Sequence, residues 1–499
     1  MSQPNYIVAL DLGTTGNRAI LFDREGHIVG QAYRELTQHY PQPGWLEHDA
    51  AEIWKEVRWV LTTALAEVNI KPSQIAAIGL TVQRETCLLW DKTTGEPLHK
   101  AIVWQDRRTA PLCDRLRSEG KAELIYNKTG LILDAYFSAT KLNWLIDAVK
   151  QSGVSDFSNV LAGTVDSWAL WNLTGGKVHA TDHSNASRTM LLNIDTHQWD
   201  SELLDLFGIP DHIMPEVRPS LGEFGLLDKS ILGVEIPITA VLGDQQAALF
   251  AHGCDRPGLL KCTYGTGSFL VAHTGSEVAR APQLLSTIAW SEGNGSKAKK
   301  VGYALEGAMF TSGACIQWLR DGLKIIDDAG QTDAIARSVP DTNGVYFVPA
   351  LSGLGAPHWD MSARGAFLGI TGGAQRAHMV RAVLESLAFQ VKEVVNAVNA
   401  NSKTPINCLK VDGGACKNDF LMQFQADVLG IPVERPEILD ATAQGAAFAA
   451  GLATGFWDDY HAIVFTRKVD KVFEPDVNAD LSAHFEKWSE AVSRGKDWA

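Results

Sequence analysis

Two short loops rich in glycine and threonine constrain the fold of this chain more than any other feature. The first is DLGTTGN, from Asp11 to Asn17, and the second is YGTGS, from Tyr264 to Ser268. Each loop joins two apolar runs of strand character, so we expect two strand–turn–strand units. Such a turn presents backbone N–H groups and hydroxyls in a concavity that suits a polyphosphate. Because one loop lies in each half of the chain, the sequence predicts a nucleotide held between two related lobes.

The length of the chain fits two lobes. Its 499 residues exceed the size at which a single hydrophobic core stops growing, roughly 250–300 residues. We place the boundary near residue 252, with an N-terminal lobe over residues 1–252 and a C-terminal lobe over residues 253–499. The net charge of −14 argues against nucleic acid or an anionic membrane as the main partner.

Cysteine usage and hydropathy favour the cytoplasm. The seven cysteines are scattered and include no C-x-x-C pair, so neither a disulfide framework nor a zinc site is predicted. The chain enters a predicted strand almost at once, with no basic and apolar leader. The longest nearly apolar stretch, Ala441 to Ala453, is too short to cross a bilayer. We expect a soluble cytoplasmic protein.

The predicted secondary structure repeats once along the chain. In the first half we expect strands at 5–11, 17–23 and 27–35, a helix after a capping box of Asp49 and Glu52, and a strand at 75–82. In the second half we expect strands at 259–264, 269–273, 286–292 and 299–305, a helix with an apolar face from Val380 to Val398, a strand at 409–411 and a helix that begins near Asn418. This alternation predicts an α/β protein.

The residues around the first loop suit a phosphate site with a metal. Asp11 ends the first strand and precedes Gly13-Thr14-Thr15-Gly16. A carboxylate there is well placed to hold Mg²⁺ through water, and Arg18 would steady the charge of a transferring phosphoryl group. Either loop alone fits a tight β-turn equally well, but the pair, with Thr266 in the second loop, favours phosphate binding. The chain has no G-x-x-x-x-G-K-[ST] motif, so it is not a P-loop enzyme.

A second glycine-rich turn suits an adenine ring. Asp412-Gly413-Gly414 follows a predicted strand, and Asn418 begins the next helix. Glycine there would let a flat base approach the backbone closely, and Gly313 and Gln317 would close the other side of the pocket. A plain strand-to-helix turn explains the same residues equally well.

Polar residues at the ends of other strands suit a polyol. Gln83-Arg84-Glu85 follows one buried strand, and Gly243-Asp244-Gln245-Gln246 follows another. Ligands collect at such strand ends in open α/β sheets, and a guanidinium beside a carboxylate offers donors and acceptors to vicinal hydroxyls. Asp244 would accept the proton of a substrate hydroxyl during phosphoryl transfer. Taken singly, an Arg-Glu pair is more often a surface ion pair.

Longer stretches carry a family resemblance. The chain resembles the FGGY carbohydrate kinases over essentially its whole length. The stretches that carry the resemblance include YIVALDLGTT, PGWLEHD, IAAIGLTVQRET, AIVWQDRRT, TGLILDAYFSATKLNWL, NASRTMLLNI, GDQQAALF, YGTGSF, YALEGA, GLGAPHWD and VDGGACKNDFLMQ. The V-Q-R-E-T form resembles the members that phosphorylate glycerol rather than those that phosphorylate pentuloses.

This resemblance implies a fold and a reaction. The fold is the two-lobed actin/hexokinase/Hsp70-type (ribonuclease H-like) α/β fold, with duplicated β-β-β-α-β-α-β-α cores around a central cleft. The reaction is transfer of the γ-phosphoryl group of ATP to glycerol, which yields sn-glycerol 3-phosphate and ADP, with Mg²⁺ as cofactor. The resemblance also implies a homo-oligomer, either a dimer or a tetramer.

The resemblance also implies roles for single residues. Asp244 would be the general base and, together with Asp11, would face the metal. The implied contacts to glycerol are Arg84, Glu85, Tyr136, Asp244 and Gln245, with Trp104 and Phe269 against its carbon edge. The implied contacts to the nucleotide are Thr14, Thr15, Gly16, Arg18, Thr266, Gly313, Gln317, Gly414 and Asn418.

The chain departs from the family pattern at two places. Where many members that phosphorylate glycerol read G-T-T-S-S-R, this chain has Gly16 and Asn17, which removes two hydroxyls from the expected phosphate loop. The glycine- and arginine-bearing loop that binds fructose 1,6-bisphosphate in regulated bacterial members has no counterpart around 229–236, KSILGVEI. The second departure predicts that this sugar bisphosphate does not inhibit.

Two alternatives stay open from the sequence. One is a kinase for a neighbouring substrate such as dihydroxyacetone, erythritol or a pentulose, although the bulk of Trp104, Tyr136 and Phe269 favours a three-carbon ligand. The other is an ATP-driven chaperone or filament protein with the same fold. Such a protein has no need for Arg84 and Asp244 to face each other, so ADP release that depends on a polyol discriminates between them.

Overall fold

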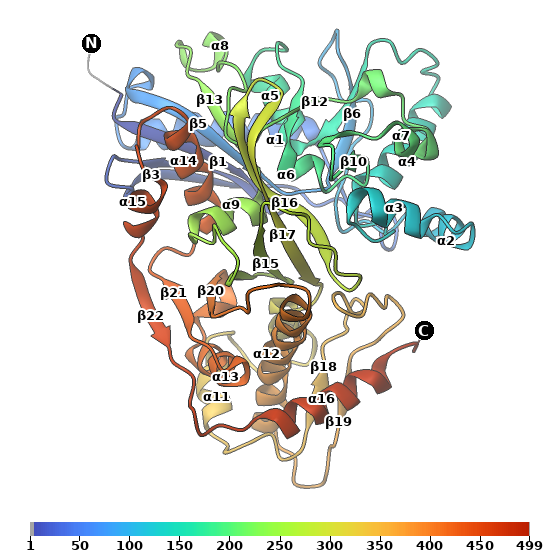
Figure 1. Ribbon diagram of the computed structural model, residues 1–499, viewed down its shortest axis with the longest axis vertical. Helices are drawn as coiled ribbons and strands as arrows, with labels where there is room; N and C mark the ends of the chain where they lie inside the picture. The colour runs from blue at the N-terminus through green and yellow to red at the C-terminus, as the bar shows by residue number, and fades with distance from the viewer. Residues whose placement is uncertain (1–3, 499) are drawn as a thin grey trace.

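Two mixed β-sheets, one in each lobe, organise the chain (Figure 1). The computed structural model describes residues 4–498. In Figure 1 the first lobe lies above and the second lobe lies below. The α/β architecture expected from the sequence is confirmed.

The first lobe is built on a five-stranded sheet in the order β13-β5-β1-β2-β3. The first three strands along the chain form an antiparallel meander, and β5 and β13 extend the sheet in parallel from the other side of β1. The strands are β1 (Tyr6–Leu12), β2 (Gly16–Phe22), β3 (Ile28–Glu35), β5 (Ile75–Val82) and β13 (Ile238–Gly243). The predicted meander and the predicted strand at 75–82 are confirmed.

The second lobe repeats this topology in a seven-stranded sheet. Its inner order, β17-β15-β14-β20-β21, matches β3-β2-β1-β5-β13 of the first lobe, with β16 and β22 added at the edges. The strands are β14 (Leu259–Tyr264), β15 (Ser268–Gly275), β16 (Leu285–Asn294), β17 (Lys297–Met309), β20 (Cys408–Asp412), β21 (Val433–Pro436) and β22 (Val469–Phe473). The expected duplication is therefore present, and each Gly/Thr loop joins the first two strands of its sheet.

Helix α1 (Ala50–Glu67) covers β2 and β3 with its apolar stripe. Asp49 caps its N-terminus as predicted, because the carboxylate accepts from the backbone N–H groups of Ala51 and Glu52. The predicted capping box is wrong in its second half. The Glu52 carboxylate instead accepts from the backbone and hydroxyl of Thr37, at 3.2 and 2.8 Å. The chain that enters from β3 passes close enough to take this acceptor.

An insertion between β5 and β13 supplies one side of the cleft. It holds β6 (Cys87–Asp91), β7 (Ala101–Ile102) and β8 (Val160–Thr164), which form a four-stranded sheet with β4 (Glu47–His48) from the segment before α1. It also holds two short pairs, β9 (Ala180–Asp182) with β12 (Glu216–Arg218) and β10 (Leu192–Asn193) with β11 (Gln198–Trp199). Its helices are α2 (Ala110–Ser118), α3 (Ala122–Thr129), α4 (Ser138–Gln151), α5 (Val165–Leu173), α6 (His183–Ala186), α7 (Ser201–Phe207) and α8 (Lys229–Leu232).

Helices pack on both faces of the second sheet. Helix α12 (Arg376–Ala400) contains the predicted apolar face, and α13 (Asp419–Leu429) begins after its N-cap Asn418, as predicted. The other elements are α9 (Asp244–Ala251), which follows β13 in the first lobe, and α10 (Gly313–Gln317), α11 (Gln331–Arg337), α14 (Ala441–Ala453), α15 (Tyr460–Phe465), α16 (Ser482–Gly495), β18 (Tyr346–Val348) and β19 (Ala366–Leu368). Among residues 4–498, every helix falls short of the length or the hydropathy that a bilayer span requires.

Helix α14 packs against the first lobe, although it lies beyond the boundary at residue 252. It packs against α9 and against β1, β5 and β13, and Figure 1 shows it beside the first sheet. The approach is close because small residues meet. A Cβ on Gly445 would lie 1.8 Å from the carbonyl oxygen of Ala247, and one on Gly79 would lie 2.1 Å from that of Ala446. The C-terminal part of the sequence thus completes the first lobe.

The hairpin of β16 and β17 reaches the other way, from the second lobe into the first (Figure 1). On β16, the hydroxyl oxygen of Ser291 lies 2.7 Å from Nδ1 of His183 and accepts from the backbone N–H of Ser220 at 3.0 Å. The two lobes are therefore joined by exchanged elements as well as by their facing surfaces, and β17 carries a charged side chain into the site.

Candidate active site

A pocket of about 390 Å³ lies between the two Gly/Thr loops and the ends of β5 and β13. Both lobes line it. Its lining residues are Thr14, Thr15, Gln38, Tyr40, Arg84, Glu85, Trp104, Gln105, Tyr136, Asp244, Gln245, Thr263, Gly265, Thr266, Gly267 and Phe269. All seven residues proposed to contact a polyol and three of those proposed to contact a nucleotide therefore face one cavity.

Arg84 and Glu85 enter the pocket from a strained turn at the end of β5. Glu85 has φ of 62°, in the left-handed region that few residues other than glycine adopt. The N–H of Thr86 donates to the carbonyl of Arg84 at 2.7 Å, which makes Glu85 the centre of a γ-turn. The Ser138 hydroxyl donates to the carbonyl of Glu85 at 3.0 Å and helps to hold this turn. Two consecutive side chains can then both point into the cavity.

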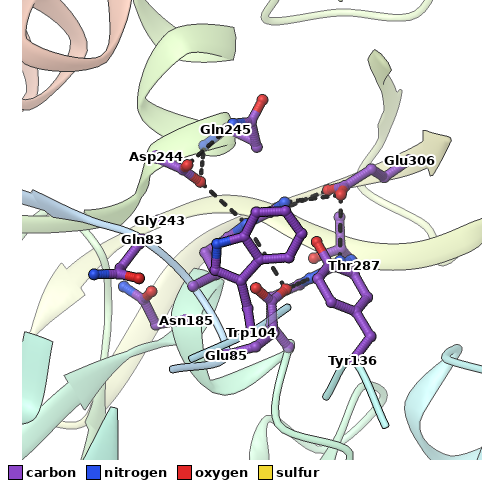
Figure 2. A network of polar contacts seen from close by, with 12 residues as sticks. Gln83, Glu85, Trp104, Tyr136, Asn185, Gly243, Asp244, Gln245, Thr287 and Glu306 are labelled. Carbon is purple, nitrogen blue, oxygen red and sulfur yellow. Dashed lines mark hydrogen bonds and ion pairs between the residues drawn. The ribbon is translucent and has the colours of Figure 1, made fainter. Parts of the chain in front are cut away.

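Asp244 begins helix α9 and lies opposite Arg84. The Nε of Arg84 is 3.2 Å from Oδ1 of Asp244. The same carboxylate accepts from Gln245 twice, from its backbone N–H at 2.7 Å and from its side-chain amide at 3.1 Å. Figure 2 shows Asp244 and Gln245 together at one end of the network and Glu85 and Glu306 at other points around it. The side chain of Asp244 is 29% exposed, so it remains reachable from the pocket.

Glu306 and Arg188 support these residues from behind, and the sequence analysis assigned a role to neither. Glu306, on β17, accepts from both terminal nitrogens of Arg84, and one of its oxygens lies 3.2 Å from Arg188. Arg188 in turn donates to Glu85 at 2.7 Å. Both are fully buried. Burial alone would raise the pKa of Glu306, but Arg188 and Arg84 lower it to about 2. The signal that could have identified Glu306 is a glutamate inside the otherwise apolar strand run YALEGAM.

Three aromatic rings form the apolar wall of the pocket. The Trp104 ring centroid lies 5.6 Å from that of Tyr136 and 5.9 Å from that of Phe269, both edge to face. The indole N–H of Trp104 donates to the hydroxyl of Thr14 at 2.9 Å, so the wall is attached to the first Gly/Thr loop. Burial raises the pKa of Tyr136 far above its usual range, which keeps the phenol protonated as a hydrogen-bond donor.

The two Gly/Thr loops have matching geometry. The N–H of Gly13 donates to the carbonyl of Gly16 at 3.0 Å, and that of Gly265 donates to the carbonyl of Gly267 at 2.9 Å. Thr15 is exposed at the tip of the first loop. Each turn thus leaves free backbone N–H groups and threonine hydroxyls facing the cleft between the lobes, as a polyphosphate requires.

Comparison with known proteins agrees with this arrangement. The description "FGGY family of carbohydrate kinases, N-terminal domain" matches residues 6–251, and the corresponding C-terminal domain matches residues 260–454. This chain belongs to the FGGY family of carbohydrate kinases. A glycerol kinase of Acaryochloris marina is 68% identical over all of both chains, and one of Trichormus variabilis is 66% identical over 100% of this chain and 99% of that relative.

Solved structures of FGGY kinases share the fold. The crystal structure of Plasmodium falciparum glycerol kinase with ADP has a TM-score of 0.90 and 34% sequence identity, and covers 99% of each chain. Gluconate kinase from Lactobacillus acidophilus has a TM-score of 0.86 at 24% identity and covers 98% of this chain and 97% of its own. The second match supports the fold alone. The Plasmodium falciparum enzyme has a closely similar fold, and its crystal structure contains ADP.

The departures from the FGGY pattern in the first loop affect the sheet more than the cleft. Gly16 begins β2, is buried, and leaves no room for a side chain, because a Cβ there would lie 2.5 Å from the carbonyl of Arg34. The buried Asn17 amide donates to the carbonyl of Ile53 in α1 at 3.2 Å. Neither residue lines the pocket, and the Asn17 side chain is held against α1.

Asp11 and Arg18 lie beside the first loop, behind the lining of the pocket. The hydroxyl of Thr442 donates to the Asp11 carboxylate at 2.9 Å. Burial raises the pKa of Asp11 to about 6, although Arg18 and Thr442 act to lower it. Arg18 forms its ion pair with Asp440 from the segment that leads into α14. Arg18 and Thr442 only partly offset the cost of burying the Asp11 carboxylate. A cation bound beside it would supply the missing compensation.

The metal site implied for the family fits these residues. Residues 4–498 contain no group of three or more metal-ligating side chains. Mg²⁺ bound with a nucleotide needs only one or two carboxylates, because phosphate oxygens and water complete its shell. The Asp244 carboxylate acts to raise the pKa of Asp11, so the two carboxylates lie near enough to interact beside the first loop. Two carboxylates so placed fit this donor set.

The residues proposed for adenosine lie apart from the 390 Å³ pocket. Gly313 is tied to the second loop, since its N–H donates to the carbonyl of Gly265 at 3.0 Å. Gln317 is exposed at the end of α10. Gly414 is also exposed, and a Cβ at this position would meet open space. The amide of Asn418 donates to Thr332 at 3.0 Å while its oxygen caps α13. The geometry joins Gly313 to the second phosphate loop, whereas Gln317, Gly414 and Asn418 do not line the pocket.

Proposed function

We propose that this protein is a glycerol kinase that transfers the γ-phosphoryl group of ATP to a terminal hydroxyl of glycerol. The observation that carries the proposal is the convergence of Arg84, Glu85 and Asp244 on one small pocket with two phosphate-type loops at its mouth. The full-length identity to glycerol kinases of two other organisms supports the same substrate.

The proposed pocket offers each part of a triol a partner. The guanidinium of Arg84 donates to hydroxyls, the carboxylate of Glu85 accepts from them, and the phenol of Tyr136 supplies a further donor. Trp104 and Phe269 pack against the carbon edge. Gln245 lies beside Asp244 and completes the polar side. The bulk of Trp104, Tyr136 and Phe269 favours a three-carbon ligand over erythritol or a pentulose.

Chemistry follows from the position of Asp244. As the glycerol oxygen forms its bond to the γ-phosphorus, its proton passes to the Asp244 carboxylate, and the bond from the γ-phosphorus to the β–γ bridging oxygen breaks to release ADP. The backbone N–H groups of both loops, with Thr14, Thr15 and Thr266, would hold the phosphates in line. If its pair with Asp440 opened, the Arg18 guanidinium would be free to contact the transferring phosphoryl group. The aromatic wall excludes water, which limits hydrolysis of ATP.

Mg²⁺ would neutralise charge on the β- and γ-phosphates when bound with ATP. Asp11 and Asp244 are the residues that would hold it, through water. Gly16, Gly313, Gln317, Gly414 and Asn418 complete the proposed nucleotide site, with the last three toward adenosine. By family resemblance we also infer a cytoplasmic homo-oligomer, and the seven free cysteines fit a reducing compartment.

ADP release with a panel of polyols and ketoses tests the function. The panel should include glycerol, dihydroxyacetone, erythritol, D-xylulose and gluconate, each with ATP and Mg²⁺. We expect the highest kcat/KM with glycerol, and product analysis should give sn-glycerol 3-phosphate. A clear preference for another compound of the panel would move the assignment to another FGGY kinase. Release of ADP that no compound stimulates would favour a nucleotide-driven protein without a small substrate.

A further inference from the structure

One fully buried lysine lies directly behind the proposed base. Lys261 is on β14 of the second lobe and is completely inaccessible to solvent. An ammonium group is costly to bury unless its N–H groups are paired. Here Nζ donates to the side-chain oxygen of Gln245 and, at 2.8 Å, to the hydroxyl of Thr263. No role in the reaction proposed above uses this cation.

The first contact fixes which way the Gln245 amide points. Because the amide oxygen faces Lys261, the amide nitrogen is left to donate to Oδ2 of Asp244 at 3.1 Å. A reversed amide would place its N–H groups against the ammonium, which has no acceptor. The other carboxylate oxygen of Asp244 is held by the backbone N–H of Gln245 and by Arg84. Lys261 therefore determines one of the hydrogen bonds that orient Asp244.

The second contact leads to the proposed adenosine side. Thr263 is the register partner of Asp412, the last residue of β20 before Gly413 and Gly414. Asp412 also lies 2.6 Å from Nε2 of His252, which caps the C-terminus of α9. Helix α9 is thus attached to the second lobe at both ends, at Gln245 through Lys261 and at His252 through Asp412.

We propose that Lys261 is a positioning residue that holds Asp244 for phosphoryl transfer by orienting Gln245, and that it joins this carboxylate to the strand leading into the adenosine loop. The inference rests on the proposed function, because it needs Asp244 to act as the base. It assigns no contact between Lys261 and either substrate. The loss of Lys261 is expected to lower turnover and to leave the binding of glycerol nearly unchanged.

Lys261→Met is the primary test. Replacing a buried charge by an apolar side chain of similar length is often neutral or stabilising, so we expect a folded variant with a Tm close to that of the parent protein. We expect kcat at saturating glycerol and ATP to fall about 10- to 100-fold, since small misplacements of reacting groups have effects of this size. The KM for glycerol should change by less than about threefold on the same ground. A kcat within twofold of the parent would overturn the proposal.

Lys410→Met is the matched control. Lys410 is the register partner of Lys261 on β20, but its ammonium pairs with Glu434 at 3.5 Å rather than with Gln245. We expect it to retain the turnover of the parent protein. An equal loss of kcat in both variants would show a general effect of altering this strand pair and would count against a specific role for Lys261.

Gln245→Glu tests whether the Gln245 amide orients Asp244. It also tests the proposal if Lys261→Met does not fold. This variant keeps an acceptor for Lys261 and even strengthens the contact, but it removes the N–H that Asp244 accepts. If Gln245 only contacts glycerol, the KM for glycerol rises and kcat is retained, whereas the proposal predicts a kcat loss of at least tenfold with that KM nearly unchanged and the fold intact. Absence of glycerol-dependent activity in the parent protein would instead refute the proposed function, so the two failures are distinguishable.

Discussion

Glu306 accepts hydrogen bonds from both terminal nitrogens of Arg84, at 2.6 and 2.8 Å, although the two residues lie on strands of different lobes. Arg84 follows β5 of the first sheet, and Glu306 lies on β17 of the second. Burial would lower the pKa of Arg84, but Glu306 and Glu85 raise it well above its usual range. The proposed polyol-binding residues are therefore held in place from both sides of the cleft.

Glu306→Gln should impair both stability and catalysis. The substitution leaves the buried guanidinium of Arg84 without its carboxylate, and breaking such a pair costs about 3–5 kcal/mol of unfolding free energy. We expect kcat/KM for glycerol to fall at least about 100-fold because Arg84 loses its orientation. Denaturant unfolding and ADP release measure the two effects. The control is Glu292→Gln on β16, where the carboxylate is exposed and pairs with Lys300 at 3.4 Å. Parent-like values for the Glu306 variant would contradict this role.

Asp244→Asn should separate binding from chemistry. The amide keeps the shape of the carboxylate but cannot take a proton, so kcat should fall by a factor of about 10² or more. The fold should persist, because Asp244 is partly exposed and asparagine is accommodated at the first position of α9. Steady-state kinetics and equilibrium binding of glycerol are the measurements. Near-normal turnover would remove Asp244 from the chemistry.

Local patterns in the sequence predicted the strands, the two Gly/Thr loops and the helix around Val383, because each depends on neighbours a few residues away. They did not predict that Glu306 meets Arg84 across 222 positions or that α14 completes the first lobe. An alanine-rich helix carries only a weak periodic signal, and nothing local indicates which sheet it joins. Position at strand ends suggested polyol binding for Arg84 and Glu85 and a base role for Asp244, and family resemblance implied the same roles. The structure places these side chains around one pocket.

Fructose 1,6-bisphosphate should not inhibit this enzyme. Residues 229–236 contain a single basic side chain, Lys229, and it pairs with Glu235 at 3.5 Å. A bisphosphate needs several cationic or N–H donors, which this segment does not offer. Initial rates with increasing fructose 1,6-bisphosphate, at subsaturating glycerol, test the expectation. Strong inhibition at physiological concentrations would show that another site binds the sugar.

Acid should destabilise the fold through His183. This histidine is 1% exposed, and burial lowers its pKa to about 4. The unfolded chain takes up the proton near pH 6.5 while the folded chain does not, so the stabilisation is full above pH 6.5 and is lost as pH falls toward 4. At pH 5 this amounts to about 2 kcal/mol. The unfolding free energy of His183→Gln should fall less between pH 7.5 and pH 5. The same change at exposed His27 is the control, and equal acid sensitivity in all three proteins would refute the assignment.

Gly445→Ala should lower both stability and turnover, although Gly445 does not line the pocket. A methyl group at Gly445 would lie 1.8 Å from the carbonyl of Ala247 in α9, and backbone cannot turn aside as a flexible side chain can. Helices α9 and α14 must then separate, and their first turns carry Asp244 and Thr442, the partner of Asp11. We expect a loss of about 1–3 kcal/mol in stability, with a fall in kcat. The control is Gly372→Ala, whose Cβ would meet open space. If the Gly445 variant kept full turnover and Tm, the contact between these helices would not be what holds the two carboxylates in place.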